Sequence, residues 1–163
     1  MSVNKHVPHI HVLPEDDADR QIANGFCQEL GVNQRKIQIL PEVGGWEDVV
    51  KVFIKVHALE MRRLPHRLVV LLIDFDGRIN RLDEVKQKIP DDLINRVFIL
   101  SVLEEPEDLK KSTGKSFEVI GKELANNCVN GKNGLWDHDL LKHNKSELDR
   151  MITLVKPFLF DGK

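Results

Sequence analysis

The chain has 163 residues, of which 41% are hydrophobic, and a formal net charge of −2 at pH 7. This size is typical of one domain with a sizeable core, and the near-neutral charge excludes a basic field over the whole molecule while leaving room for a local basic face. Neither Cys27 nor Cys128 has the spacing of a zinc site or a disulfide framework, and no apolar run reaches membrane-spanning length. The N-terminus also lacks the apolar core of a signal peptide, so we expect a cytoplasmic protein without a membrane segment.

The chain begins with a strand followed by a helix. Residues 9–14 alternate and then become apolar, which predicts a short strand that ends at Glu15. Residues 18–30 carry apolar side chains at helical spacing, the last of them Leu30, and Gly31 is a stop signal. The first unit is therefore one strand and one helix.

A second unit of the same kind comes next. Residues 36–41 repeat the strand pattern, and Gly44 and Gly45 form a flexible turn after it. A helix is predicted over residues 46–63. Its expected buried stripe consists of Val49, Val50, Phe53, Val56, His57 and Met61.

The third predicted strand is the most informative stretch of the chain. Residues 67–74 form an almost unbroken apolar run that ends in Asp74, with Asp76 and Gly77 close behind, as in a parallel strand buried on both faces. Since side chains alternate along a strand, Asp74 and Asp76 should point the same way and share a divalent cation. The alternative is ordinary turn chemistry, in which Gly77 supplies a positive φ.

The rest of the chain contains one more strand and several helices. Further helices are predicted over residues 82–89, after Pro106, over 116–128 and over 146–160, and a fourth apolar strand over 95–103. Strands that alternate with helices imply right-handed crossovers and a parallel sheet. The predicted fold is thus a single α/β domain over residues 1–163, a three-layer α/β/α arrangement with a mainly parallel four-stranded sheet. Its core covers about residues 8–108, and a helical extension covers about 109–163.

Acidic residues come directly after three of the four predicted strands. Glu15 lies at the end of the first strand, Asp74 and Asp76 at the end of the third, and Glu104 and Glu105 at the end of the fourth. Parallel strands share one carboxyl edge, where ligands of open α/β sheets bind. Acids gathered there from different strands favour a metal site over turn chemistry alone.

The order of these motifs resembles the Toprim domain, the metal-dependent catalytic module of topoisomerases, primases and several nucleases. It is most similar to the subtype found in the overcoming-lysogenization-defect (OLD) nucleases and related small Toprim proteins. The matching features, over about residues 8–108, are Glu15 with Asp19 four residues later, the pair Gly44-Gly45, the motif Asp74-Phe75-Asp76-Gly77, and Glu104 or Glu105.

The resemblance implies a nuclease that uses Mg²⁺ or Mn²⁺ to cleave or transfer phosphodiesters of DNA or RNA. It implies Glu15, Asp74 and Asp76 as catalytic residues, and Glu15, Asp19, Asp74, Asp76 and Glu105 as metal ligands. Such a cation neutralises charge on the attacking and leaving oxygens of a phosphoryl group. A lysine that steadies the phosphate is expected among Lys110, Lys111, Lys115 and Lys122.

Two features depart from the family. Asp16 stands where the family usually has glycine. The ATPase that precedes the domain in OLD nucleases does not fit into this length, so the protein acts alone or with a partner protein in trans, and it could form an oligomer.

Two other interpretations remain. A non-catalytic Toprim-fold module could serve a partner ATPase or toxin. A phosphotransferase of the haloacid-dehalogenase type also uses Asp-x-Asp-Gly, but its motif normally ends the first strand, whereas here it ends the third.

Overall fold

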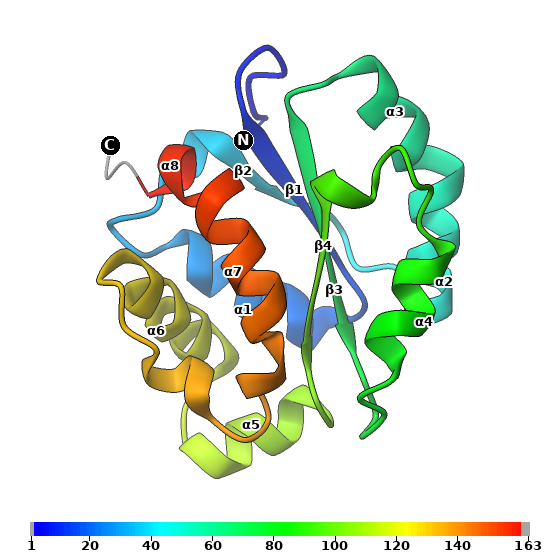
Figure 1. Cartoon of the computed structure of the whole chain (residues 1–163). Coiled ribbons are helices and arrows are strands. Elements are labelled where there is room, and N and C mark those ends of the chain that lie inside the picture. Colours follow the sequence, from blue (N-terminus) through cyan, green and yellow to red (C-terminus); the bar gives the residue numbers. More distant parts are fainter. Residues whose placement is uncertain (1, 161–163) are drawn as a thin grey trace.

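A four-stranded parallel sheet with the order β2-β1-β3-β4 lies at the centre of the protein (Figure 1). The structure is a computed structural model that describes residues 2–160. Its strands are β1 (His9–Pro14), β2 (Ile37–Ile39), β3 (Arg67–Asp74) and β4 (Val97–Val102). In the register Val12 lies beside Val70, which lies beside Phe98. The chain adds β2 on one side of β1 and β3 on the other, so the order reverses between β1 and β3, the position where open α/β sheets bind ligands.

Helices cover both faces of the sheet, which confirms the predicted three-layer α/β fold (Figure 1). One layer consists of α2 (Trp46–Val52), the π turn η2 (Phe53–His57), α3 (Ala58–Arg63) and α4 (Arg81–Lys88). The other contains α1 (Asp17–Cys27), α5 (Pro106–Thr113), α6 (Phe117–Val129), α7 (Lys145–Leu154) and α8 (Lys156–Leu159). Short 3₁₀ turns are η1 (Gln34–Lys36), η3 (Ile94–Arg96), η4 (Gly134–Asp137) and η5 (Lys142–Asn144).

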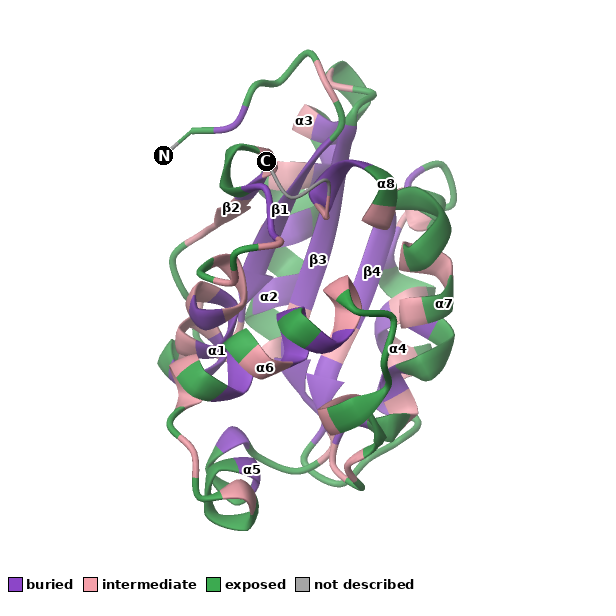
Figure 2. Ribbon diagram, turned by 90° about the vertical axis from the view of Figure 1, so that its left-hand side faces the viewer, coloured by how far each residue is buried: buried purple, intermediate pink, exposed green. Residues whose placement is uncertain are grey.

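Strand β3 is buried along almost its whole length (Figure 2), and its side chains alternate between two cores. Val69, Leu71 and Ile73 pack against the α2–α4 layer and are at most 1% exposed. Leu68 and Val70 face the layer of α1, α6 and α8. Burial on both faces explains why this strand is an apolar run rather than an alternating pattern.

The predicted helix over residues 46–63 is continuous, but its predicted stripe is partly wrong. The π turn η2 interrupts the α-helical spacing. An i→i+5 turn takes in an extra residue and rotates the remainder of the helix about its axis. Val56, expected inside, is consequently 53% exposed, while Ala58 and Met61 are buried.

The structure also corrects two other predicted helices, one at its end and one in its middle. Helix α1 ends at Cys27, so Leu30 lies beyond it and is 91% exposed. The predicted C-terminal helix is broken at Val155 into α7 and α8.

Side chains of α7 and the residue before it cover the outer edge of β4. The Ile99 amide donates to Oε1 of Glu147 (2.9 Å), and the Ser101 amide donates to Oδ1 of Asn144 (2.9 Å). Glu147 is fully buried, and its carboxylate is paired with Lys86 of α4 and Arg150 of α7, both at 3.0 Å. Buried acceptors thereby replace a fifth strand and leave these edge amides satisfied.

Candidate metal centre

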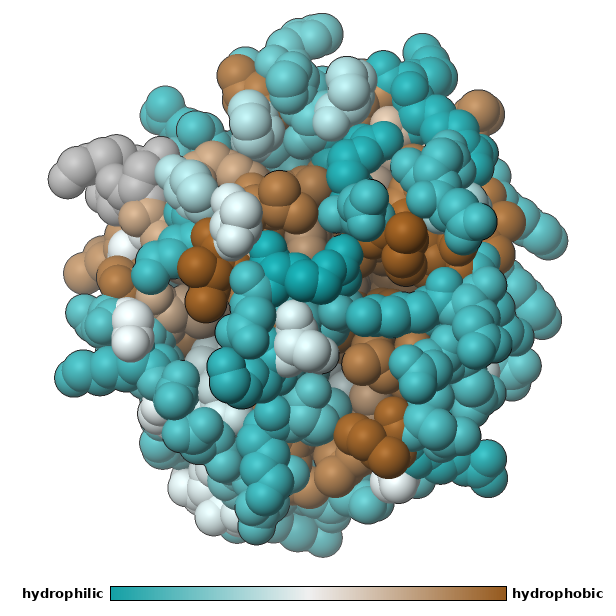
Figure 3. Space-filling model, viewed as in Figure 1, coloured by the Kyte–Doolittle hydropathy of each residue, from teal (hydrophilic) through white to brown (hydrophobic). Residues whose placement is uncertain are grey.

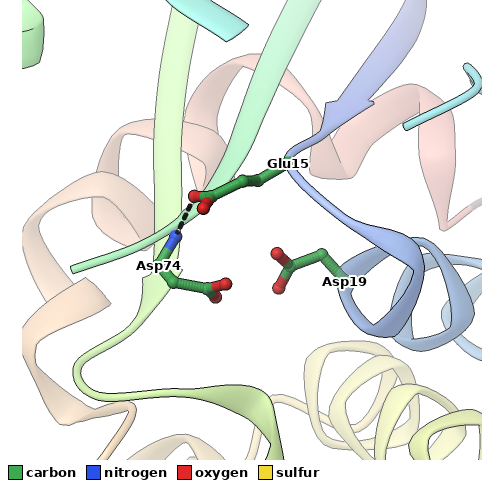
Figure 4. A group of neighbouring side chains, drawn as sticks. All are labelled: Glu15, Asp19 and Asp74. Atoms are coloured by element: carbon green, nitrogen blue, oxygen red, sulfur yellow. Dashed lines mark hydrogen bonds between the residues drawn. The ribbon is translucent and has the colours of Figure 1, made fainter. Parts of the chain in front are cut away.

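Three carboxylates converge at the carboxyl edge of the sheet, at the switch between β1 and β3 (Figure 4). Glu15 comes directly after β1, Asp74 is the last residue of β3, and Asp19 lies in the first turn of α1. Each offers one oxygen, and these oxygens all lie within 4.8 Å of one another. Of the described residues, these are the ones whose geometry would suit a shared metal ion.

The turn from β1 into α1 aims Asp19 at the other two acids. Asp16 has extended backbone (φ −139°) and caps α1, its Oδ1 accepting the Asp19 amide at 2.9 Å. A side-chain acceptor at this position fixes the first turn of a helix. Asp16 therefore fits the local backbone and adds negative charge beside the site.

Hydrogen bonds hold Glu15 between β3 and the loop after β2. Its Oε1 accepts the Asp74 amide at 2.9 Å, and its own amide donates to Leu72 O at 2.8 Å. The Gly44 amide donates to the Glu15 carbonyl oxygen at 2.8 Å, with Gly44 at φ 136°, a conformation that favours glycine. The predicted glycine turn therefore holds the backbone of Glu15 through Gly44. Gly45 serves as the N-cap of α2.

The triad is short of positive charge. Asp19 is fully buried and Asp74 is 4% exposed, and no N–H group of the described residues donates to either Asp19 oxygen or to Oδ1 of Asp74. Burial, reinforced by the charge of Glu15, raises the pKa of Asp74 to about 8. Burial likewise raises the pKa of Glu15 to about 7, and burial together with Asp74 and Asp16 raises the pKa of Asp19 well above its usual range. A bound cation would relieve both the desolvation and the repulsion.

Asp76 lies outside this triad. Strand β3 ends at Asp74, and Asp76 takes a left-handed backbone (φ 50°), so the alternation expected to bring the two together stops short of it. Its half-exposed carboxylate accepts from Nη1 of Arg81 at 2.7 Å. Its predicted catalytic and metal-binding roles stay predictions.

Arg81 is a site residue that sequence reasoning missed. Its Nη1 also donates to the Asp74 carbonyl oxygen (3.1 Å), and its guanidinium stacks on the ring of Trp46 at 4.6 Å. The buried arginine therefore ties the turn after β3 to the start of α2. Its position at the start of the helix that follows Asp-x-Asp-Gly could have indicated that it lies close to these aspartates.

The structure separates the two acids after β4. Glu105 is exposed and caps α5 in a reciprocal pair with Asp108. Glu104 lies against Gly77 in the turn after β3, where a Cβ on the glycine would be 2.7 Å from Glu104 Oε1. Gly77 has φ 78°, so both its backbone and its neighbour require glycine. Glu104, rather than the predicted Glu105, is thus packed beside the Asp74–Gly77 turn, and the predicted metal role of Glu105 has no geometric support here.

The four candidate lysines lie on or beside α5 and α6. Two have local partners, since Lys115 pairs with Glu123 and Lys110 lies over the ring of Phe117 at 5.0 Å. None joins the triad in the described structure, and a phosphate-binding role for any of them stays a prediction.

The fold and site together define a parallel α/β domain with a buried carboxylate triad at its switch point. No protein-family model, curated protein or solved structure matches the chain. In the part of the chain that is described, no helix combines the length and apolar character needed to cross a membrane.

Proposed function

We propose that Glu15, Asp19 and Asp74 bind a divalent cation, Mg²⁺ or Mn²⁺, and that the protein is a Toprim-type nuclease acting on nucleic acid. The observation that carries the proposal is the meeting of three carboxylates from the end of β1, from α1 and from β3 at the ligand-binding edge, where both Asp19 oxygens and Oδ1 of Asp74 are buried without a donor. Hard oxygen donors suit these cations. When bound, such a cation supplies charge neutralisation for phosphodiester cleavage.

The side chains around the triad have distinct tasks in this proposal. Glu15 is the most exposed of the three, so it is the acid of the triad that can exchange a proton with water or substrate at the site. Asp19 and Asp74 hold the cation from the buried side. Arg81 orients Asp76, whose half-exposed carboxylate is available to a second cation or to substrate.

The Toprim assignment is supported by how the matching motifs meet. The glycine pair touches the first acid through the hydrogen bond from Gly44 to Glu15, and Glu104 packs against the glycine of Asp-x-Asp-Gly. Motifs that are distant in the sequence therefore contribute to one place in the fold, as a shared catalytic centre requires.

Cleavage assays test the proposal directly. Single- and double-stranded DNA and RNA are incubated with the protein in Mg²⁺, Mn²⁺ or EDTA, and calorimetry measures cation binding. Asp74→Asn should abolish both cation binding and cleavage, whereas Asp83→Asn, an exposed acid in the first turn of α4, should change neither. Metal-dependent cleavage that survives Asp74→Asn would remove the triad from the mechanism.

The burial of Asp19 and Asp74 favours a second candidate function. A cation held mainly by buried groups could serve stability alone, in a binding module that acts with a partner ATPase or toxin. Cation binding without cleavage, together with a stoichiometric partner, would favour this module. Hydrolysis of a generic aryl phosphate would instead point to the phosphotransferase.

A further inference from the structure

A cavity of about 340 Å³ lies between the sheet and the layer of α1, α6, α7 and α8. This size is within the range of small-molecule sites. In the view of Figure 2, β3 and β4 are seen between α6 and α7 on this side of the sheet. The cavity is lined from the strands by residues such as Val70, Leu72 and Leu100, from α7 by Met151 and Ile152, and from the junction of α7 and α8 by Val155.

Burial differs between the two faces of the central strands. On the α2–α4 face, Leu71 and Ile99 are at most 1% exposed. On the cavity face, Leu72 of β3 and Leu100 of β4 are only partly buried although helices cover this face too. Since protein interiors are normally close-packed, apolar strand side chains that stay partly exposed beneath covering helices indicate room for an apolar ligand.

Two amide side chains on the cavity wall already have partners within the protein. The Asn144 side chain bonds to both the amide and the carbonyl of Ser101, and Oδ1 of Asn127 accepts the Leu135 amide at 2.8 Å. A ligand inside would therefore find few free polar partners there. An aliphatic chain meets this condition, because its burial needs no direction and no hydrogen bonds.

Charged side chains of both signs line this apolar space. They are four lysines, Lys132, Lys142, Lys145 and Lys156, and three aspartates, Asp19, Asp137 and Asp149. Lys142 and Lys145 are paired with Asp139 and Asp149. Lys132 and Lys156 have no carboxylate partner among residues 2–160. They are placed to receive an anionic head group.

Figure 3 shows a mostly hydrophilic face on which apolar side chains gather in separate patches. The cavity, by contrast, has an apolar wall that includes two lysines without a carboxylate partner in the described part of the chain, a combination that fits an aliphatic chain with an anionic end. We propose that this cavity binds a free fatty acid, with its aliphatic chain over Leu72 and Leu100 and its carboxylate near Lys132 and Lys156.

Titration calorimetry with dodecanoate, below its micelle concentration and in EDTA, tests this binding. We expect one dodecanoate per chain, and binding at least about tenfold weaker for dodecyltrimethylammonium, which has the same chain length and the opposite charge. Lys132→Ala and Lys156→Ala should each weaken dodecanoate binding about two- to fivefold, the range of an exposed ion pair. Equal binding of both detergents, or lysine variants that bind as the wild type does, would overturn the choice of an anionic ligand.

Variants that fill the cavity test the binding site independently of the lysine variants. Leu100→Trp and, as a second variant, Met151→Trp should weaken dodecanoate binding at least about tenfold while circular dichroism shows a folded protein. Leu82→Trp, a half-buried leucine that packs on the opposite face, is the matched control and should bind as the wild type does. No dodecanoate binding by the wild type, or binding that folded filled variants retain, would refute the site. Because EDTA is present, the outcome is independent of the proposed metal centre.

Discussion

The buried triad should make the stability of the metal-free protein fall as the pH rises. Asp74 has an ordinary pKa of 3.8, and its environment raises that pKa to about 8. The folded state therefore binds this proton more tightly than the unfolded state between these pH values, so deprotonation favours unfolding. The difference corresponds to about 6 kcal/mol of unfolding free energy, of which about 4 kcal/mol falls between pH 5 and pH 8.

The assay is urea denaturation in EDTA of the wild type and of Asp74→Asn at pH 5 and pH 8. Asparagine keeps the shape of the side chain without its charge, so the variant should lose less stability over this range. The pKa of Glu15, raised to about 7, also falls with the charge of Asp74 removed, because repulsion by Glu15 and Asp74 is mutual. The charged groups that face Asp74 are Glu15, Asp16, Asp19, Asp76 and Arg81.

Buried histidines change stability with pH in the opposite direction. Their contribution cancels when the wild type is compared with Asp74→Asn, because both proteins contain the same histidines. Burial lowers the pKa of His9, His11, His57 and His143. The folded state then binds these protons less tightly, so they make stability rise with pH up to about 6.5. Only the difference between wild type and variant isolates the triad. An Asp74→Asn protein whose pH dependence parallels that of the wild type would refute the reasoning.

Addition of Mg²⁺ or Mn²⁺ should restore the stability that the metal-free protein loses as the pH rises. At a Mg²⁺ or Mn²⁺ concentration of 100 times Kd, binding stabilises the folded state by about 2.7 kcal/mol, or about 5–10 °C in Tm for a chain of this size. The increase should be larger at pH 8 than at pH 5, because protons compete with the cation for the carboxylates. A Tm that is unchanged by either cation at pH 8 would contradict the metal centre.

Three further changes test other parts of the structure by urea denaturation. Glu147→Ala leaves Lys86 and Arg150 without their buried partner and should destabilise the fold by about 3–5 kcal/mol; a cost below about 1 kcal/mol would contradict the covered edge of β4. Gly77→Ala should cost more than Gly114→Ala, about 2 kcal/mol against about 1 kcal/mol: both have positive φ, but only Gly77 has Glu104 against it. Equal costs would contradict that packing. Asp16→Ala removes the α1 cap and should cost about 1 kcal/mol at pH 5. It should cost less at pH 8, where the variant also relieves repulsion of the ionised triad; the opposite order would contradict this electrostatic role.

The sequence alone determined the layers of the fold and the edge at which the acids gather. A run such as residues 67–74 is apolar because both faces of β3 are covered, and this pattern is local enough to be recognised without neighbours. Once four such strands alternate with helices, a parallel sheet is expected, and with it the common edge for Glu15 and Asp74.

Only the tertiary structure decided which acids meet. Asp74 and Asp76 are two residues apart, yet the strand ends between them, and Asp76, whose own backbone is left-handed, pairs with Arg81. Asp19 enters the site because Asp16 caps the helix that carries it. These arrangements depend on backbone dihedrals in turns and on partners far away in the chain, which a period of two or 3.6 residues does not encode. Residue spacing thus determined where the candidate centre lies, whereas turn geometry and long-range packing determined that it consists of Glu15, Asp19 and Asp74.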